Sequence, residues 1–314
     1  MEIQTKPNNQ SKIITRTLCA IVTLVLLGLA RPSLAQNPAE SFQKMFEQFS
    51  SQANQFAPGM MGEMTLEQKA KLASIKVSVQ EERQAGQKAI DAFLEHAAKQ
   101  KWKVVADGKD VRYLKQLVKL VSPRMKHEDR YGQWDIRVVE MDGADAYSFA
   151  GGHLLFTKGL LETVGSEAAL VGVIAHELSH LDREHLLMPL KQAKMMNQPL
   201  TGLDGFSMMA LFARPFRPEN ESEADRDAVE WMMAAGYDPK ELSRMLHQWD
   251  AKQSQAAPWM DFVPGFVKTH PDPGRRAQRV LEVGQDFVSR YPNANFIGRE
   301  NLIKRQPRTA QNGK

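Results

Sequence analysis

Residues 166–185 read SEAALVGVIAHELSHLDREH, and this stretch carries the strongest structural signal in the chain. Ser166 is a favoured helix N-cap residue, and the apolar residues that follow it form a stripe too broad for an exposed helix. The stretch therefore predicts a largely buried helix from Ser166 to about His185. His176 and His180 are four residues apart, so they lie on one face of that helix.

His176, Glu177 and His180 together favour a catalytic metal site. Two imidazoles at this spacing can converge on one ion. Two histidines plus one carboxylate leave a fourth position open for water, which is typical of catalytic zinc. Glu177 can reach such a water and take its proton as a general base. The alternative is a pair of surface histidines, but the apolar neighbours at 173–175 argue against an exposed helix.

The carboxylate ligand must come from another part of the chain, and an acidic stretch begins about 40 residues later, at Glu219. Glu221 and Asp225 share one helix face, so Glu221 can bind the ion while Asp225 hydrogen-bonds the far nitrogen of a ligand histidine. Spacing alone does not choose among Glu219, Glu221 and Glu223. The alternative is an acidic first turn that the helix dipole favours.

The remaining pattern predicts helices, then a small sheet, then helices again. Alternating β-branched residues predict a strand at 134–139, and shorter strands are expected at 146–149 and 153–157, with a turn at Gly151-Gly152 between them. This order favours an α+β fold, mostly helical, with a small sheet beside the metal helix. The expected helices run from a capping box at 65–68 to about Leu94, from Val111 to Val121 with Asp110 as cap, from near Glu219 to Gly236, and onward from Asp238.

Residues 1–35 have the layout of a secretory signal peptide. Basic residues precede an apolar run at 18–30, and the small-residue triplet that ends at Ala35 predicts cleavage there and export to the periplasm. The alternative is an uncleaved anchor, although a run of about 13 residues is short for a membrane span. Cys19 is the only cysteine, so a chain cleaved after Ala35 has no disulfide, thiol nucleophile or cysteine-ligated metal.

Charge excludes one class of partner. The whole chain has 41 basic and 37 acidic residues, a net charge of +4, but residues 1–35 hold four of the basic residues and one of the acidic ones. The remaining chain has a net charge of about +1. We therefore expect no nucleic-acid partner.

The segments on either side of the predicted domain at 64–290 differ from it in composition. Residues 36–63 are rich in Met, Phe and Gln and are expected to be a linker or a short packed helix. The alternative is an amphipathic segment for a partner or for peripheral association with the outer membrane. Residues 291–314 are polar and are expected to form a loosely held tail.

Three motifs occur together in an order typical of one family. His-Glu-Leu-Ser-His stands at 176–180. Glu-Ser-Glu-Ala-Asp at 221–225 is followed by Ala-Gly-Tyr-Asp-Pro at 235–239. Thr-His-Pro at 269–271 precedes Arg276. Together with residues 145–161, this pattern resembles the HtpX/BepA-like group of gluzincin metallopeptidases, which are related to the CAAX prenyl endopeptidases. The similarity covers roughly residues 65–285.

The resemblance implies a zincin-like fold with one zinc ion per chain. It implies His176, His180 and Glu221 as metal ligands, Glu177 as general base, and Asp225 as the acid that supports a ligand histidine. It also implies that His270 and Arg276 form a polar pair near the active site. His270 either stabilises the oxyanion or binds zinc in a latent state, and the alternative is an ordinary loop histidine. The strand at 153–157 is expected to pair with an extended substrate.

The resemblance also implies polypeptide substrates, in particular misfolded or misassembled cell-envelope proteins. The chain is expected to be a compact exported member, without the long apolar helices or the helical repeats of other members. Residues 195–216 lie between the metal helix and the third ligand and are expected to form a lid, or alternatively a hairpin that only packs. The other function classes are a non-hydrolytic chaperone that uses the same cleft and a structural metal protein.

Overall fold

The computed structural model describes residues 65–195, 216–255, 270 and 272–308. All of these residues belong to one compact unit. The expectations for residues 1–35 and 36–63 lie outside the described residues. Within the described part of the chain, no helix is both long enough and apolar enough to cross a membrane.

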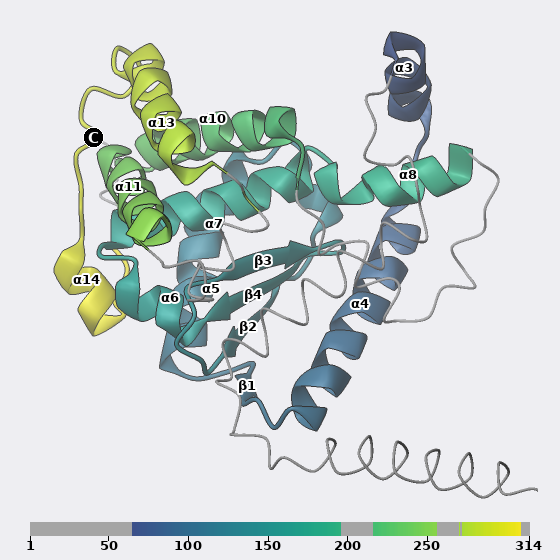
Figure 1. Ribbon diagram of the computed structural model, residues 1–314, viewed down its shortest axis with the longest axis horizontal. Helices are drawn as coiled ribbons and strands as arrows, with labels where there is room; N and C mark the ends of the chain where they lie inside the picture. Colours follow the sequence, from purple (N-terminus) through teal and green to yellow (C-terminus); the bar gives the residue numbers. More distant parts are fainter. Residues whose placement is uncertain (1–64, 196–215, 256–269, 271, 309–314) are drawn as a thin grey trace, which may run out of the picture. The chain divides into compact units, whose positions relative to one another are not determined.

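The described sheet is small and mixed, which confirms the α+β class (Figure 1). Its strand order is β1-β2-β4-β3, with β1 and β2 antiparallel, β2 and β4 parallel, and β3 and β4 antiparallel. The predicted strands at 146–149 and 153–157 are confirmed, while the two-residue β1 was not predicted. The strands are β1 (Val104–Val105), β2 (Asp135–Val139), β3 (Ala146–Phe149) and β4 (His153–Thr157).

Strand β4 occupies an inner position in this sheet. Gly151 and Gly152 have φ angles of +79° and +88°, a left-handed conformation that glycine adopts without strain, and they turn the chain from β3 back into β4. Strand β4 then pairs with β2 on one edge and β3 on the other. The expectation that residues 153–157 pair with substrate is therefore wrong, because both edges of β4 are already hydrogen-bonded. Among the described strands, β3 is the terminal one on that side.

Most of the described chain is helical. The single long helix expected from residue 65 is wrong, because α3 ends at Ser74 and α4 begins anew at Val79. Ser78 and Glu81 form the capping box that starts α4. The helices are α3 (Leu66–Ser74), α4 (Val79–Lys99), α5 (Lys109–Val121), α6 (Lys158–Thr163), α7 (Glu167–Asp182), α8 (Met188–Met195), α10 (Pro218–Ala234), α11 (Lys240–Gln255), α13 (Pro273–Phe287) and α14 (Arg299–Lys304).

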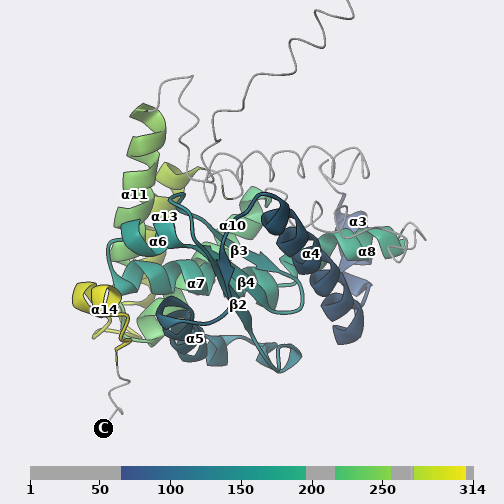
Figure 2. The same cartoon turned by 90° about the horizontal axis from the view of Figure 1, so that it is seen from below.

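Helix α7 is the centre of the fold, and every one of its residues is buried. The Ser166 hydroxyl accepts a hydrogen bond from the Ala169 amide and so starts the helix as predicted. The helix contacts β3 and α5 on one side and α10 and α11 on the other (Figures 1 and 2). It ends at Asp182, three residues earlier than expected, because Glu184 has a φ of +58° and turns the chain away from the helix axis.

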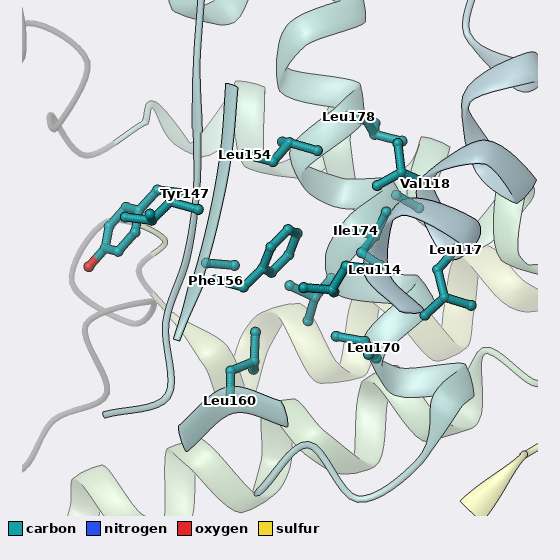
Figure 3. Close-up of a cluster of buried hydrophobic side chains, with 14 of the residues drawn as sticks. Leu114, Leu117, Val118, Tyr147, Leu154, Phe156, Leu160, Leu170, Ile174 and Leu178 are labelled. Carbon is teal, nitrogen blue, oxygen red and sulfur yellow. The ribbon is translucent and has the colours of Figure 1, made fainter. Parts of the chain in front are cut away.

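The apolar core lies between α7, α5 and the sheet (Figure 3). Ile174 is one of three α7 residues spaced by four, so all three lie on one face. They face Leu154 and Phe156 of β4, whose side chains point to the same side of the strand. The three α7 residues are Leu170, Ile174 and Leu178, and each is less than 1% exposed. This packing fixes the position and rotation of the helix that carries the two histidines.

Gly172 lets α7 and its neighbours pack closely on the opposite side. A Cβ atom at this position would lie 2.9 Å from Sδ of Met232 in α10 and 3.1 Å from Leu242 in α11. A larger side chain would push α10 outward. Because α10 also carries Glu221, the small residue at 172 helps to bring the acidic motif close to the histidines.

The chain after Pro292 is packed against the domain, so the expected loose tail is wrong for residues up to 308. Leu302 of α14 is buried, and Arg305 forms a 2.7 Å ion pair with Asp110. The backbone amide of Arg308 donates a hydrogen bond to the buried carboxylate of Glu167. Sequence composition predicts polar character correctly, but it does not show these partners.

Candidate metal centre

Four side chains from three parts of the chain converge on one point. His176 and His180 come from α7, Glu221 from the first turn of α10, and His270 from just before α13. One ligand atom of each lies within 4.8 Å of those of the others, and all four side chains are buried. The predicted ligands His176, His180 and Glu221 are therefore brought together, with His270 beside them.

The spacing of these atoms suits a small tetrahedral ion. Nε2 of His176 lies 3.0 Å from Nε2 of His180 and 3.1 Å from Nδ1 of His270. The Glu221 carboxylate lies 3.4 Å from His180, 3.5 Å from His176 and 2.9 Å from His270. Bonds of about 2.0–2.1 Å to zinc separate neighbouring ligand atoms by roughly 3.3 Å. The four donors fit zinc in both chemistry and distance.

The buried side chains also keep lone pairs that a metal ion could use. Oε2 of Glu221 makes no hydrogen bond, although Nη1 of Arg276 is an ion-pair partner at 3.2 Å. Burial lowers the pKa of His180 to about 3, so its imidazole is neutral at neutral pH and keeps a lone pair for a metal. Burial opposes charge on Glu221 as well, but His270 and Arg276 hold the pKa of this carboxyl well below its usual range. A neutral imidazole and an ionised carboxylate are the forms that bind zinc.

The three candidate glutamates of α10 do not share one helix face. Glu221 is buried among the histidines, whereas Glu219 is exposed. Glu223 lies on the opposite side of the helix and contacts His185. Successive helical residues are rotated by about 100°, so Glu219 and Glu223 lie about 40° apart on one face of α10, while Glu221 lies on the opposite face, toward the histidines. This geometry selects Glu221 as the carboxylate of the group.

Asp225 and Arg276 form a buried ion pair behind His176. Nε and Nη2 of Arg276 donate to the two carboxylate oxygens of Asp225 at 2.9 and 2.7 Å. Asp225 Oδ1 also lies 3.0 Å from Nδ1 of His176, the nitrogen that faces away from the group. Burial opposes ionisation, but Arg276 and His176 lower the pKa of Asp225 to about 2. The carboxylate is therefore charged and can orient the imidazole of His176.

Glu177 lies beside the group, and its two carboxylate oxygens have different surroundings. Ser148 of β3 donates a 2.7 Å hydrogen bond to Oε2. Oε1 is buried, makes no hydrogen bond, and lies 3.3 Å from Nε2 of His270. One oxygen is thus held in place, and the other is available to accept a proton.

His270 lies between two acids. Burial lowers its pKa, but the Glu221 and Glu177 carboxylates outweigh this effect and raise the pKa to about 9. Its Nδ1 faces Glu221 and its Nε2 faces Glu177. The same ring can therefore donate toward Glu177 or, once deprotonated, offer Nδ1 as a fourth metal ligand.

Comparison with known proteins gives the family of this chain. A model of peptidase family M48 matches residues 109–210 and 202–283, which together are more than half of the chain. The chain belongs to peptidase family M48. This assignment confirms the resemblance to the HtpX/BepA-like metallopeptidases.

Curated relatives of this M48 chain share part of it at low identity. It is 26% identical to the beta-barrel assembly-enhancing proteases of Yersinia pestis, over 159 residues, and of Escherichia coli K12, over 160 residues. Each alignment covers 44% of this chain and 32% of the relative. It is also 24% identical over 160 residues to the mitochondrial metalloendopeptidase OMA1 of Schizosaccharomyces pombe, covering 48% of this chain and 46% of that protein. The chain thus spans less than half the length of these relatives.

Two residues of the M48 site, Ser148 and His185, were not predicted from the sequence, whereas Phe216 belongs to the segment expected to form a lid. Ser148 holds Glu177, and His185 contacts the outer nitrogen of His180. Phe216 stacks on His180 with the ring centroids 3.7 Å apart and covers that side of the metal centre. Alternation along β3 could have placed Ser148 on the helix-facing side. The expected lid at 195–216 lies almost entirely outside the described residues, apart from its two ends.

Proposed function

We propose that the protein is a zinc-dependent metalloendopeptidase with one zinc ion per chain. The observation that supports this most is the convergence of His176, His180 and Glu221 at ligand distances beside Glu177, whose Oε1 has no hydrogen bond. Membership of peptidase family M48 agrees with it. A purely structural metal site would need no carboxylate placed as Glu177 is.

The proposed chemistry assigns proton transfer to Glu177. A bound zinc ion supplies Lewis acidity, which makes a nearby water acidic near neutral pH and polarises a peptide carbonyl. Glu177 takes the proton of the attacking water on Oε1 and delivers it to the leaving amine. Ser148 keeps Oε2 engaged throughout, so Oε1 is the atom that exchanges the proton. Arg276 keeps a positive charge within 3.2 Å of Glu221 and holds Asp225 behind His176.

We assign the substrate path to β3 rather than β4. Strand β3 is the terminal described strand on the side of α7, and its Ser148 contacts Glu177 directly. An extended peptide that runs along β3 would therefore pass the general base, in the manner of β-strand addition.

Two alternative roles of His270 can be distinguished by a single substitution. If His270 stabilises the oxyanion, then His270→Ala lowers kcat by about 10²–10³-fold. If His270 instead fills the fourth ligand position in a latent state, the same substitution opens that position and raises activity. The short distances from its Nδ1 to His176 and Glu221 support the latent role. Peptidase assays of this variant at equal zinc content distinguish the two roles.

We propose polypeptide substrates of the cell envelope, met in the periplasm. The names of the bacterial relatives refer to β-barrel assembly and protease activity, which supports misassembled envelope proteins as the substrate class. The signal-peptide layout of residues 1–35 supports export. Peripheral contact with the outer membrane through residues 36–63 belongs to the same proposal.

The proposal is tested with purified protein and an unfolded substrate such as casein. Cleavage by the wild type should stop on addition of a chelator and return with zinc. Glu177→Gln should lower kcat by about 10²–10⁴-fold while zinc stays bound, because the amide cannot accept the proton. Tight zinc binding without cleavage, together with suppression of casein aggregation, would instead favour the chaperone.

The third ligand is tested by substitutions on α10. Glu221→Ala should lose stoichiometric zinc. Glu219→Ala should retain it, because this carboxylate is exposed and outside the group. Zinc content by atomic absorption reads out both variants. Loss of zinc from Glu219→Ala alone would exclude the assignment of Glu221.

A further inference from the structure

The two ligand histidines are held from behind in different ways. Nδ1 of His176 faces the buried carboxylate of Asp225 directly. Nδ1 of His180 instead lies 2.9 Å from Nδ1 of a third histidine, His185, whose Nε2 lies 3.1 Å from Oε2 of Glu223. The support of His180 is therefore a chain of two residues that ends at a half-exposed carboxylate.

The hydrogen bonds that link His180, His185 and Glu223 allow one consistent placement of the ring protons. His180 faces the other ligand atoms with Nε2, so a metal-binding imidazole must carry its proton on Nδ1. That N–H donates to Nδ1 of His185, which must then be the unprotonated nitrogen of its ring. His185 therefore carries its proton on Nε2 and donates it to the Glu223 carboxylate. Each contact has one donor and one acceptor.

The backbone explains how His185 reaches His180. Residues five apart on a straight helix are rotated by about 140° and do not meet. Here α7 has already ended, and the left-handed conformation of Glu184 folds His185 back under His180. His185 is 7% exposed and is the first residue of a short 3₁₀ turn. Its ring thus has a fixed place between α7 and α10.

Glu223 is held in turn by its neighbours at the surface. Nη1 of Arg183 lies 3.6 Å from its carboxylate, and Arg183 is itself bound by Asp227 through two hydrogen bonds. These residues line an open polar cavity on the side of α10 that faces away from Glu221. The hydrogen bonds from His180 through His185 to Glu223 therefore connect the buried centre to a polar surface.

We infer that His185 and Glu223 are positioning residues that fix the tautomer and ring orientation of His180 and so strengthen zinc binding. The inference rests on the proposed function, because it needs zinc at His180. Outer partners of metal-bound histidines typically contribute 10–100-fold to metal affinity. His185 and Glu223 support His180 independently of Asp225 and Arg276, which support His176. The Glu223 carboxylate is accessible to solvent.

The experiment measures zinc affinity of the full chain by competition with a chromophoric chelator. His185→Leu should weaken zinc binding by about 10–100-fold, and Glu223→Ala by about tenfold. His185→Asn should recover most of the loss, because its side-chain oxygen can accept from His180 and its amide can donate to Glu223. Glu219→Ala is the matched control, since it removes an exposed carboxylate from the same helix.

A second readout separates positioning from general damage. The visible absorption of the cobalt-substituted protein should change in His185→Leu and return toward the wild type in His185→Asn. If His185→Leu fails to fold, Glu223→Ala and His185→Asn still decide the question, because Glu223 fills no core space. Zinc affinities equal to that of Glu219→Ala would overturn the inference and leave the proposed function intact. A wild type that binds no zinc would overturn the proposed function itself.

Discussion

The side of α7 that faces the sheet and the side that faces α10 are equally buried, but they are held in different ways. Toward the sheet, Leu170, Ile174 and Leu178 fill space against other apolar side chains. Toward α10, His176 and His180 bury polar atoms, each with a partner at hydrogen-bond distance. Burial on the first side is favourable by itself, whereas burial on the second is tolerated only while the partners stay in place.

This difference teaches how one helix serves both stability and chemistry. Apolar contacts are numerous and each contributes little, so the loss of stability on that side increases with the side-chain volume that is removed. The polar side is a network in which each charge compensates another, so removing one member leaves its partner buried and uncompensated. Substitutions on the two sides should therefore differ in size and in what they disturb.

The largest effect is expected for Asp225→Ala. It leaves the fully buried guanidinium of Arg276 without its two carboxylate hydrogen bonds, and should lower the free energy of unfolding by about 3–5 kcal/mol. Urea unfolding monitored by circular dichroism measures this change. Asp286→Ala is the control, because it removes a surface carboxylate from Arg226 and should cost at most about 1 kcal/mol. An equal loss of unfolding free energy in the two variants would show that the buried ion pair contributes no more than a surface one.

A smaller loss of stability is expected for Ile174→Ala on the sheet side of α7. The cavity left in the core should lower the free energy of unfolding by about 2–4 kcal/mol. Zinc affinity should stay within about threefold of the wild type, because no ligand partner is removed. Ile303→Ala, at an exposed position, should change neither quantity. A large loss of zinc affinity in Ile174→Ala would show that the two sides are not independent.

Sequence reasoning succeeded where the information is local. The spacing of His176 and His180 fixes their common face whatever surrounds the helix, and alternation predicted the strand at 134–139, which the structure has as Asp135–Val139. The order of the strands could not be predicted, because strand order depends on pairings between distant segments. The substrate edge at residues 153–157 was therefore taken from the family resemblance, and the observed strand order contradicts it. Sequence reasoning also left three glutamates open as the third ligand, since the rotation of α10 about its axis depends on its packing against α7.

The residues missed at the site have one physical cause in common. His185 contacts His180 only because the helix ends at Asp182 and Glu184 adopts a left-handed conformation. Neither feature can be predicted from the sequence pattern. Ser148 contacts Glu177 only because β3 packs against α7. In each case tertiary structure, rather than periodicity, sets the contact.

The smallest effect is expected for Ser148→Ala, where the sheet meets the polar side of α7. Loss of the 2.7 Å hydrogen bond frees Oε2 of Glu177, so the carboxylate spends less time with Oε1 in position. We expect kcat for casein-derived peptides to fall about tenfold, with KM, zinc affinity and unfolding free energy nearly unchanged.

Ser148→Thr keeps a hydroxyl and should restore most of this loss. Ser122→Ala removes an equally buried hydroxyl that donates to Glu128, away from the metal centre, and should leave kcat unchanged. A tenfold fall in both alanine variants would assign the effect to stability in general. A fall confined to Ser148→Ala would show that β3 acts on Glu177 directly, so that the sheet contributes to chemistry as well as to packing.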